Sequence, residues 1–232
     1  MITVRKAAER GQTNIGWLQS WHTFSFGDYW DDQHQSFRTL RVINDDIVAP
    51  GQGFGMHGHN DMEIVTWVLD GALQHRDSLG NGDTIKPGDV QRMSAGTGIM
   101  HSEFNPSPTQ PVHLLQIWIE PDRRGTRPSY EQAHVPSGER QDRWRRIADG
   151  HGRDGALRMG TDASVLATLL APGKTVTYDL APGRHAWLHV ATGRVRLGDQ
   201  ALEAGDAVAV SEQASVSITA DVVSEALLFD LP

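Results

Sequence analysis

Two short stretches of the sequence place candidate metal ligands at the spacing of one strand face. His57 and His59 are separated by one glycine, and His101 and Glu103 are separated by one serine. Because side chains at positions i and i+2 of a β-strand point to the same side, each pair can offer two ligands to one ion. Three nitrogens and one carboxylate suit Fe, Mn, Ni, Co, Cu or Zn and leave positions open for water or substrate. The spacing therefore predicts one divalent transition-metal site.

A second glutamate competes for the role of carboxylate ligand. Glu63 lies four residues after His59, so an unbroken strand would direct both side chains to the same face. The residues alone leave Glu63 and Glu103 as alternatives. Gln116 and Trp118 share one face of another expected strand, where they could line a cavity or simply pack. For the remaining histidines we expect surface or packing roles: His22, His34, His75, His113, His134, His151, His185 and His189.

The composition excludes several kinds of site. The chain has 232 residues and no cysteine, which rules out disulfides, thiolate metal ligands and a cysteine nucleophile. Its net charge of −8 repels phosphate backbones, so direct nucleic-acid binding is not expected. No apolar run approaches the ~20 residues that span a bilayer, and the polar start lacks the apolar stretch of a secretory signal. We expect a soluble, cytoplasmic protein without a membrane partner.

One apparent nucleotide-binding motif does not fit its surroundings. Residues 53–58, GFGMHG, satisfy the pattern G-x-G-x-x-G. That pattern binds a dinucleotide only between a strand and a helix, because the helix N-terminus holds the pyrophosphate. Here a β run follows, and the fifth residue of the motif is the candidate ligand His57. We therefore reject this interpretation.

Short apolar runs that end at turn residues predict an all-β fold. Residues 64–69, IVTWVL, precede Asp-Gly, and residues 114–119, LLQIWI, precede Glu-Pro. This pattern is typical of β-sandwiches and barrels. Helical periodicity is confined to one or two turns near residues 129–133 and 142–147.

A weak internal repeat predicts two similar β domains in tandem. Residues 70–73 (DGAL) are followed by residues 85–90 (IKPGDV), and residues 192–195 (TGRV) are followed by residues 202–207 (LEAGDA). A charged stretch containing Pro and Gly separates the two copies, which is typical of a linker with surface excursions. We therefore expect an N-terminal domain at residues 1–120, a linker at 121–155 and a C-terminal domain at 156–232.

Around the candidate ligands the sequence resembles the two cupin motifs and, within the cupins, the pirin family. Residues 51–71 contain a glycine, HxH, a glutamate four residues on and a closing glycine, and residues 88–105 resemble the second motif. Ser94 stands where proline is usual, and two extra residues precede His101. These departures are typical of pirins, as are five blocks in order: SWHTFSFGDYW, FRTLRVINDD, HGHNDMEIVTWVLDG, MSAGTGIMHSE and LLQIWIEP. The resemblance covers about the first 120 residues closely and the rest loosely.

The pirin resemblance implies a bicupin, with two tandem double-stranded β-helix (jelly-roll) barrels and one mononuclear metal, commonly Fe(II), in the first. Carried over by position, the family's ligands are His57, His59, His101 and Glu103, which decides against Glu63. Bacterial pirins of this kind are similar to quercetin 2,3-dioxygenases. The resemblance thus implies that a flavonol is opened by O2, with Glu103 accepting a substrate proton.

Two other roles stay open. Some pirins are described as metal-dependent regulators that bind a protein partner, and a metal-binding barrel can also act on another small molecule. Fold and metal do not decide between these roles.

The second copy is expected to lack the metal. When the repeat glycines are placed in register, Asp179, Ala181, Ile218 and Ala220 fall opposite the four candidate ligands. Three of these four side chains cannot coordinate an ion. We therefore expect the C-terminal domain to be a degenerate, metal-free cupin barrel.

Overall fold

The computed structural model describes residues 1–232, and almost all of its regular structure is β-strand. Its contacts divide the chain into two compact units. Gly11–His134 and Leu157–Thr161 form one unit, which we call the histidine barrel, and Met1–Arg10, Val135–Ala156 and Asp162–Pro232 form the other, which we call the apolar barrel. The all-β prediction is confirmed. No helix in the chain has the length and hydrophobicity needed to span a membrane.

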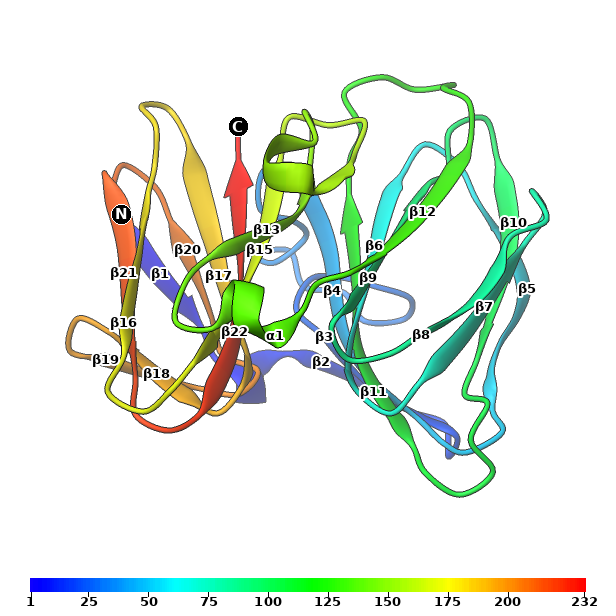
Figure 1. Cartoon of the computed structure of the whole chain (residues 1–232), viewed down its shortest axis with the longest axis horizontal. Coiled ribbons are helices and arrows are strands. Elements are labelled where there is room, and N and C mark those ends of the chain that lie inside the picture. Colours follow the sequence, from blue (N-terminus) through cyan, green and yellow to red (C-terminus); the bar gives the residue numbers. More distant parts are fainter. The chain divides into compact units, whose positions relative to one another are not determined.

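The histidine barrel consists of two antiparallel sheets (Figure 1). The larger sheet contains, in spatial order, β12 (Ser129–His134), β9 (Asp89–Ser94), β6 (Glu63–Asp70), β11 (Val112–Ile119), β4 (Leu40–Val48), β3 (Leu18–His22) and β2 (Gly11–Asn14). The smaller sheet contains β5 (Gly53–His59), β10 (Ile99–Phe104), β7 (Leu73–Asp77) and β8 (Gly82–Ile85). β5 therefore forms one edge of the smaller sheet.

Alternation of side chains builds the core between these two sheets. Leu73 and Ile85 of the smaller sheet pack with Val48, Val68 and Leu114 of the larger sheet, and all five are buried. Successive residues of a strand point to opposite faces, so every second residue enters the barrel. The strands that carry this core therefore also direct polar side chains into the same interior.

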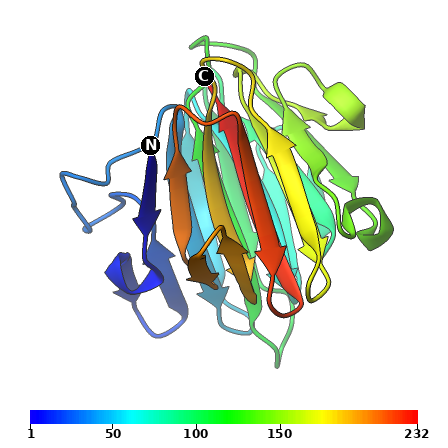
Figure 2. The same cartoon turned by 90° about the vertical axis from the view of Figure 1, so that its left-hand side faces the viewer.

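The apolar barrel is built in the same way. Its larger sheet contains, in order, β1 (Ile2–Arg5), β20 (Ala207–Val210), β17 (His185–Thr192), β22 (Ser224–Leu231), β15 (Ser164–Leu170) and β13 (Arg145–Asp149), and Figure 2 shows these strands side by side. Its smaller sheet contains β16 (Thr175–Asp179), β21 (Ser215–Ala220), β18 (Arg194–Leu197) and β19 (Gln200–Glu203). The orders β9-β6-β11-β4 and β20-β17-β22-β15 correspond strand for strand. The repeat seen in the sequence is thus a repeat of topology.

The unit boundaries differ from the expected ones. The stretch expected to be a linker contains β12, the single-turn helix α1 (Ser137–Arg140), β13 and the 3-10 turn η2 (Arg153–Gly155). It is divided between the two units after His134. The first ten residues, which include β1 and the 3-10 turn η1 (Ala7–Glu9), belong to the apolar barrel because β1 pairs with β20. The short strand β14 (Leu157–Arg158) lies in a segment of the histidine barrel.

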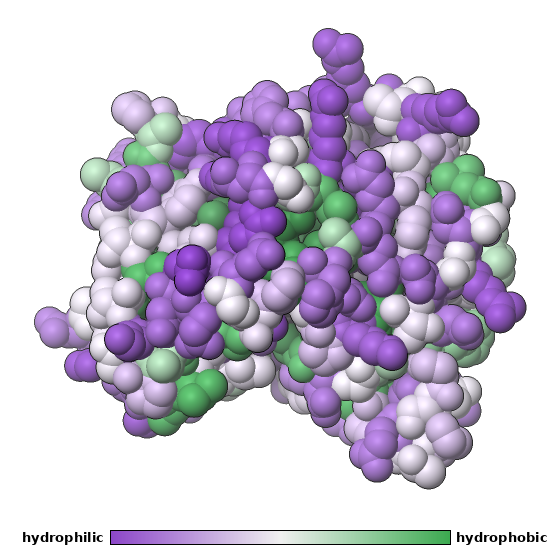
Figure 3. Space-filling view, in the orientation of Figure 1, coloured by the Kyte–Doolittle hydropathy of each residue, from purple (hydrophilic) through white to green (hydrophobic).

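The helical turns expected near residues 129–133 and 142–147 are wrong. β12 pairs with β9 along its whole length, from Ser129 opposite Ser94 to His134 opposite Asp89, and β13 pairs with β15. Weak local periodicity is outweighed by backbone pairing with an adjacent buried strand. On the molecular face shown in Figure 3, hydrophobic side chains are scattered among hydrophilic ones.

Candidate metal centre

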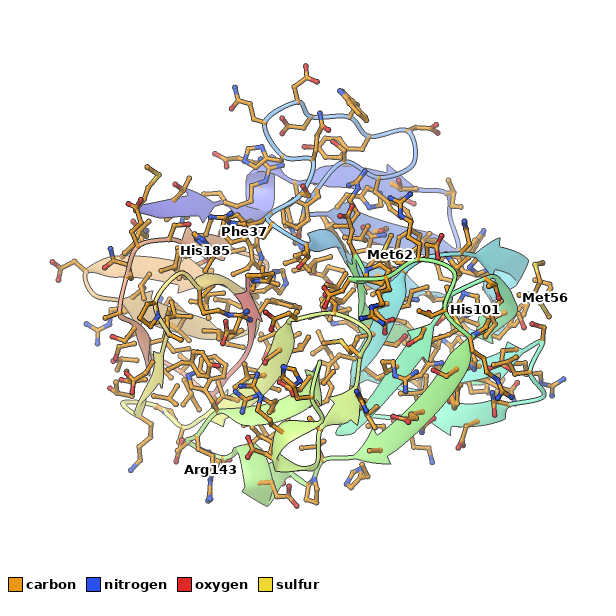
Figure 4. The ribbon with its side chains drawn as sticks, turned by 90° about the horizontal axis from the view of Figure 1, so that it is seen from above. Phe37, Met56, Met62, His101, Arg143 and His185 are labelled. Carbon is orange, nitrogen blue, oxygen red and sulfur yellow. The ribbon has the colours of Figure 1, made fainter.

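Three histidines from two adjacent strands converge inside the histidine barrel. β5 carries His57 and His59, and β10 carries His101 directly opposite His57. The candidate ligand nitrogens of the three rings all lie within 4.8 Å of one another. In Figure 4, His101 lies among interior side chains, whereas Met56 projects at the periphery. The structure therefore brings together the three histidines that the sequence singled out.

The local sequence of β5 explains how both of its histidines reach the interior. Met56, between the two inward positions, is 58% exposed, as strand alternation requires. Gly53 lies so close to β10 that a Cβ atom would overlap the backbone of Glu103 and Phe104. A glycine at this position therefore allows the close approach of the two ligand-bearing strands.

Burial keeps two of the three rings in the neutral form that binds metals. Desolvation lowers the pKa of His101 to about 2 and that of His59 to about 4, and repulsion from neighbouring histidines adds to both shifts. Both ring nitrogens of His101 are buried and have no hydrogen-bond partner within the protein. A buried polar group in that state is costly unless something else satisfies it. These features fit a divalent transition metal held by neutral imidazoles.

Glu103 lies beside the histidine group and is held by a short chain of hydrogen bonds. It lines the same cavity as His57 and His59, although it is not part of the close group of ligand atoms. Gln116 Nε2 donates to both carboxylate oxygens of Glu103, at 3.1 and 3.0 Å. Thr66 Oγ1 in turn donates to Gln116 Oε1 at 2.8 Å. The Thr66 hydroxyl thereby fixes which end of the Gln116 amide faces Glu103.

The surroundings of Glu103 favour its protonated form more than water does. Burial raises the pKa of its carboxyl to about 7, the hydrogen bond from Gln116 opposes this shift, and the nearby Asp46 carboxyl adds to it. The group can therefore exchange a proton near neutral pH.

Glu63 does not line the cavity. Ser94 Oγ donates to its carboxylate at 2.7 Å, and the backbone N–H of Gly160 donates to it as well. The expectation that Glu63 faces the histidines assumed an unbroken strand. The chain instead turns at Asp61, whose φ is 48°, and passes from the smaller sheet into the larger one. Of the residues expected around the ligands, the structure places Gln116 and Trp118 in the cavity wall and Glu63 outside it.

The cavity next to the histidines has a volume of about 520 Å³ and walls of mixed character. Aromatic rings from four segments line it: Trp17, Phe26, Phe54 and Trp118. The Trp118 ring lies edge-on to His59, with ring centroids 4.9 Å apart. Pockets of about 300–1,000 Å³ with apolar walls and a few polar groups are typical of small-molecule sites.

A polar row crosses the interior of the larger sheet, and sequence reasoning missed most of it. We use this name for five residues in cross-strand register: His22, Asn44, Gln116, Thr66 and Gln91. His22, for which a surface or packing role was expected, lines the cavity together with Asn44. The polar residues Asn44 and Asp46, which alternate in line with the apolar Val42 and Val48, were the signal that could have identified this wall.

Other histidines have the roles expected for them. His34, His113 and His134 each hydrogen-bond to a carboxylate, at 2.8, 2.6 and 2.7 Å. His75 is buried and stacks on Tyr130, with ring centroids 4.8 Å apart. None of these four lines the cavity.

Strand pairing gives a different match between the two copies from the one obtained by aligning the repeat glycines in the sequence. When β7 and β18 are matched at the glycines that precede them, Val216 and Ile218 take the places of His101 and Glu103. Tyr178, the pairing partner of Val216, takes the place of His57. The alignment had placed Ile218 opposite His101, two residues away. Val216 and Ile218 belong to the apolar core of this barrel.

Two barrels of this topology, of which one has an HxH strand paired with an HxE strand, define a bicupin with a candidate mononuclear metal centre. Comparison with protein families agrees with this class. The family model described as pirin matches residues 3–119, and the model described as quercetinase C-terminal cupin domain matches residues 147–231. The chain belongs to the pirin family.

Individual relatives extend this result over the whole chain. A quercetin 2,3-dioxygenase of Escherichia coli (strain K12) is 44% identical over 232 residues, which cover 100% of this chain and 99% of that protein. The crystal structure of the bacterial pirin YhhW from E. coli, in complex with nickel(II), has a TM-score of 0.94 at 44% identity and covers 100% and 99% of the two chains. YhaK from E. coli has a TM-score of 0.76 at 28% identity, with 96% and 98% covered. The family and bicupin predictions are confirmed.

Proposed function

We propose that the chain is a metal-dependent dioxygenase that uses O2 to open the central ring of a flavonol such as quercetin. The observation that carries this proposal is the group of three convergent histidines, with both His101 nitrogens unpartnered, beside a cavity with aromatic walls. The name of the E. coli relative supports the substrate class. The nickel(II) in the YhhW structure supports a divalent metal ion as the cofactor.

The proposed ligands are His57, His59, His101 and Glu103. Fe(II) is the first candidate ion, and Mn, Ni, Co, Cu and Zn suit the same donor set. When bound, such an ion would lower the pKa of a coordinated hydroxyl and exchange electrons with O2 and the substrate. Glu103 would be the only anionic ligand, so the site would keep a net positive charge toward an anionic substrate.

Glu103 is the proposed proton acceptor. Ring opening requires removal of the proton from the flavonol 3-hydroxyl, and Glu103 is the carboxylate in the cavity wall beside the three histidines that can take it. Gln116 donates to both oxygens of Glu103, so this carboxylate is fixed in orientation before substrate arrives. The proton would therefore move to an oxygen whose position is already determined.

The cavity walls would hold the rings of the substrate and exclude water. Trp17 and Phe54 contact each other edge to face, with centroids 5.2 Å apart, and Phe26 contacts Trp118 in the same way at 5.3 Å. These paired rings form firm apolar surfaces for a flat aromatic molecule. A dry pocket also strengthens the electrostatic interaction between Glu103 and the substrate hydroxyl.

We assign this chemistry to the histidine barrel alone. In the apolar barrel, the positions that correspond to His57, His101 and Glu103 carry Tyr178, Val216 and Ile218. A phenol at one position and aliphatic side chains at the other two do not form a site of this kind. We therefore propose that the C-terminal cupin is metal-free.

The proposal is tested by the loss of the flavonol absorbance band under air, with carbon monoxide detection, using protein loaded with each candidate metal. Glu103→Gln keeps a weak oxygen donor but removes the proton acceptor. At equal metal loading we expect its turnover to fall by ~10²–10⁴-fold, the usual cost of losing a general base. Glu63→Gln is the matched control, because this glutamate is buried but lies outside the cavity, and its turnover should stay near that of wild type.

Two outcomes would contradict the proposal. If wild type consumes no flavonol with any of these metals, the regulatory role of a metal-binding pirin with a protein partner takes its place. If Glu63→Gln loses turnover and Glu103→Gln retains it, the assignment of the carboxylate is wrong.

A further inference from the structure

The wall of the cavity contains a second polar patch on β4. Asn44 and Asp46 are two residues apart on this strand, so both side chains point into the barrel, and both line the cavity. Their neighbours on β3 are also polar, because His22 pairs with Asn44 and Ser20 pairs with Asp46. This patch belongs to the larger sheet, whereas the three histidines belong to the smaller one.

Asn44 presents a hydrogen-bond donor that nothing in the protein uses. His22 Nδ1 faces Asn44 Oδ1, which can only accept, so the proton of the neutral ring is on Nδ1 and Nε2 accepts from the Thr13 hydroxyl at 2.9 Å. His22 Nδ1 then donates to Asn44 Oδ1 at 2.8 Å. With its oxygen facing His22, Asn44 has an Nδ2 group with no acceptor among the surrounding side chains.

Asp46 presents an acceptor that the protein also leaves unused. Its side chain is only 3% exposed, and its Oδ1 is buried without a hydrogen-bond partner, while Ser20 donates to the carboxyl group. Asp45, the next residue, points to the other face of the sheet and pairs with His113 at 2.6 Å. A buried carboxyl group with an unsatisfied oxygen is destabilising by itself. The arrangement at Asp46 is thus better explained by a ligand than by packing.

We propose that Asn44 and Asp46 bind a hydroxyl group of the substrate other than the one at the metal, with the hydroxyl donating to Asp46 and accepting from Asn44. A hydroxyl group is both a donor and an acceptor, and this pair offers one partner of each kind. The inference rests on the proposed function for the flavonol skeleton, and it deepens that function by assigning the two side chains that recognise a further hydroxyl of the substrate. Asn44 and Asp46 are then specificity-determining residues.

The physical basis of the preference is the cost of unpaired groups. A flavonol with a hydroxyl at this position satisfies both side chains, whereas one without it buries them against apolar ring carbon. Sites built to hydrogen-bond a hydroxyl reject analogues that lack it for this reason.

The test compares kcat/KM for the parent 3-hydroxyflavone with that for flavonols carrying further hydroxyls, added one at a time. We expect wild type to favour at least one added hydroxyl by about 10- to 100-fold, the effect of leaving buried groups unpaired. Asp46→Leu and Asn44→Leu should each bring this ratio toward one. Any effect of either change on Glu103 acts on both substrates and cancels in the ratio. Asp45→Asn is the matched control and should keep the wild-type ratio.

A second measurement separates this inference from the proposed function. Anaerobic titration of the metal-loaded protein with the same flavonols, followed by tryptophan fluorescence, measures binding without turnover, because Trp17 and Trp118 line the cavity.

The outcomes for turnover and for binding distinguish the two proposals. If wild type turns over nothing but shows a binding preference that Asp46→Leu abolishes, the dioxygenase proposal fails and the hydroxyl subsite stands. If wild type turns over all flavonols with equal kcat/KM, or if both leucine variants keep its ratio, the subsite is wrong and the dioxygenase proposal is unaffected. Thermal melting of each variant checks folding, and two independent leucine variants keep the test decisive if one does not fold.

Discussion

The two barrels share one strand topology and differ in what their interiors contain. In the histidine barrel, Asn44, Gln116, Thr66 and Gln91 lie in register across four strands of the larger sheet. At the corresponding places, the apolar barrel has Leu166, Leu228, Leu188 and Val208, also in register. All four of these aliphatic side chains are buried in a single hydrophobic cluster.

This difference shows that strand pairing and interior chemistry are set separately. Backbone hydrogen bonds and a partial apolar core are enough to form each barrel, because the same strand order occurs with either interior. In the apolar barrel the four positions on β15, β22, β17 and β20 all add to hydrophobic burial. In the histidine barrel Gln116 and Thr66 form the hydrogen bonds that hold Glu103, and Asn44 and Gln116 line the cavity. The same four strand positions are thus apolar in one copy of the fold and polar in the other.

Removal of two of the three histidines should have the largest effect, because it leaves the histidine barrel, like the apolar barrel, without a group of convergent ligands. The double variant His57→Ala/His101→Ala loses two of three convergent nitrogens, so we expect bound metal to fall from about one equivalent to none and flavonol turnover to vanish. Elemental analysis after gel filtration measures the metal, and far-ultraviolet circular dichroism should still report a folded β protein. His134→Ala, which removes an exposed histidine paired with Asp89, is the control. Retention of one equivalent by the double variant would place the ion elsewhere, for instance in the apolar barrel.

Exchanging a residue of the polar row with its aliphatic counterpart in the apolar barrel should mainly affect stability in one barrel and activity in the other. Leu228→Gln buries an amide among aliphatic side chains, and we expect it to lower the free energy of unfolding by roughly 2–4 kcal/mol. Gln116→Leu, the reverse exchange at the corresponding place, should change that free energy by only about 1 kcal/mol, while kcat falls by about tenfold or more because Glu103 loses its donor. Urea unfolding and steady-state kinetics give the two numbers. If Gln116→Leu is the more destabilising of the two, the contrast between the interiors is wrong.

The buried carboxyl of Asp46 should make the free energy of unfolding of the protein depend on pH. Burial raises the pKa of Asp46 to about 7 from an ordinary value of 3.8, with the Ser20 hydrogen bond opposing and the neighbouring Asp45 adding. The folded protein therefore holds this proton more tightly than the unfolded chain, and stability is lost as pH rises from 3.8 to about 7.

Replacement of Asp46 by an amide removes this titration. In chelator-treated protein, Asp46→Asn should raise the melting temperature at pH 8 and change it much less at pH 4. Asp45→Asn should show no such gain, because its carboxylate is paired with His113. An equal effect of Asp46→Asn at both pH values would mean that the carboxyl of Asp46 is not destabilised when ionised.

The smallest effect is expected at the far end of the chain of hydrogen bonds that holds Glu103. Thr66→Val keeps the shape of the side chain but removes the hydroxyl that orients the Gln116 amide. The amide can still donate to Glu103 after rotation, so we expect kcat to fall only a few-fold with KM unchanged. Thr168→Val, a matched change at a buried threonine of the apolar barrel, should leave both constants unchanged. A shift in KM alone would place Thr66 in substrate binding instead.

The sequence predicted the features that depend on neighbours along one strand. The HxH and HxE pairs depend only on alternation, so the residue spacing was enough to group His57, His59 and His101. The position of Glu63 could not be predicted, because the turn at Asp61 moves the following strand into the other sheet. His22, Asn44 and Gln116 meet only through cross-strand register between segments far apart in sequence. No local pattern encodes that register, although alternation in residues 40–48 indicated that polar side chains enter the interior.

Because β5 lies at the edge of its sheet, we expect the strand that carries His57 and His59 to open locally more often than the central strands. β5 has a hydrogen-bonded neighbour on one side only, and the register of its pairing with β10 shifts beside His101. Edge strands open locally at lower free energy than central ones, so backbone amides of Gly53–His59 should exchange with deuterium while those of β6 and β11 stay protected. An ion bridging β5 and β10 would fasten this edge and slow exchange there selectively. At the proposed site, metal would then enter or leave by fraying of β5, with the rest of the barrel closed.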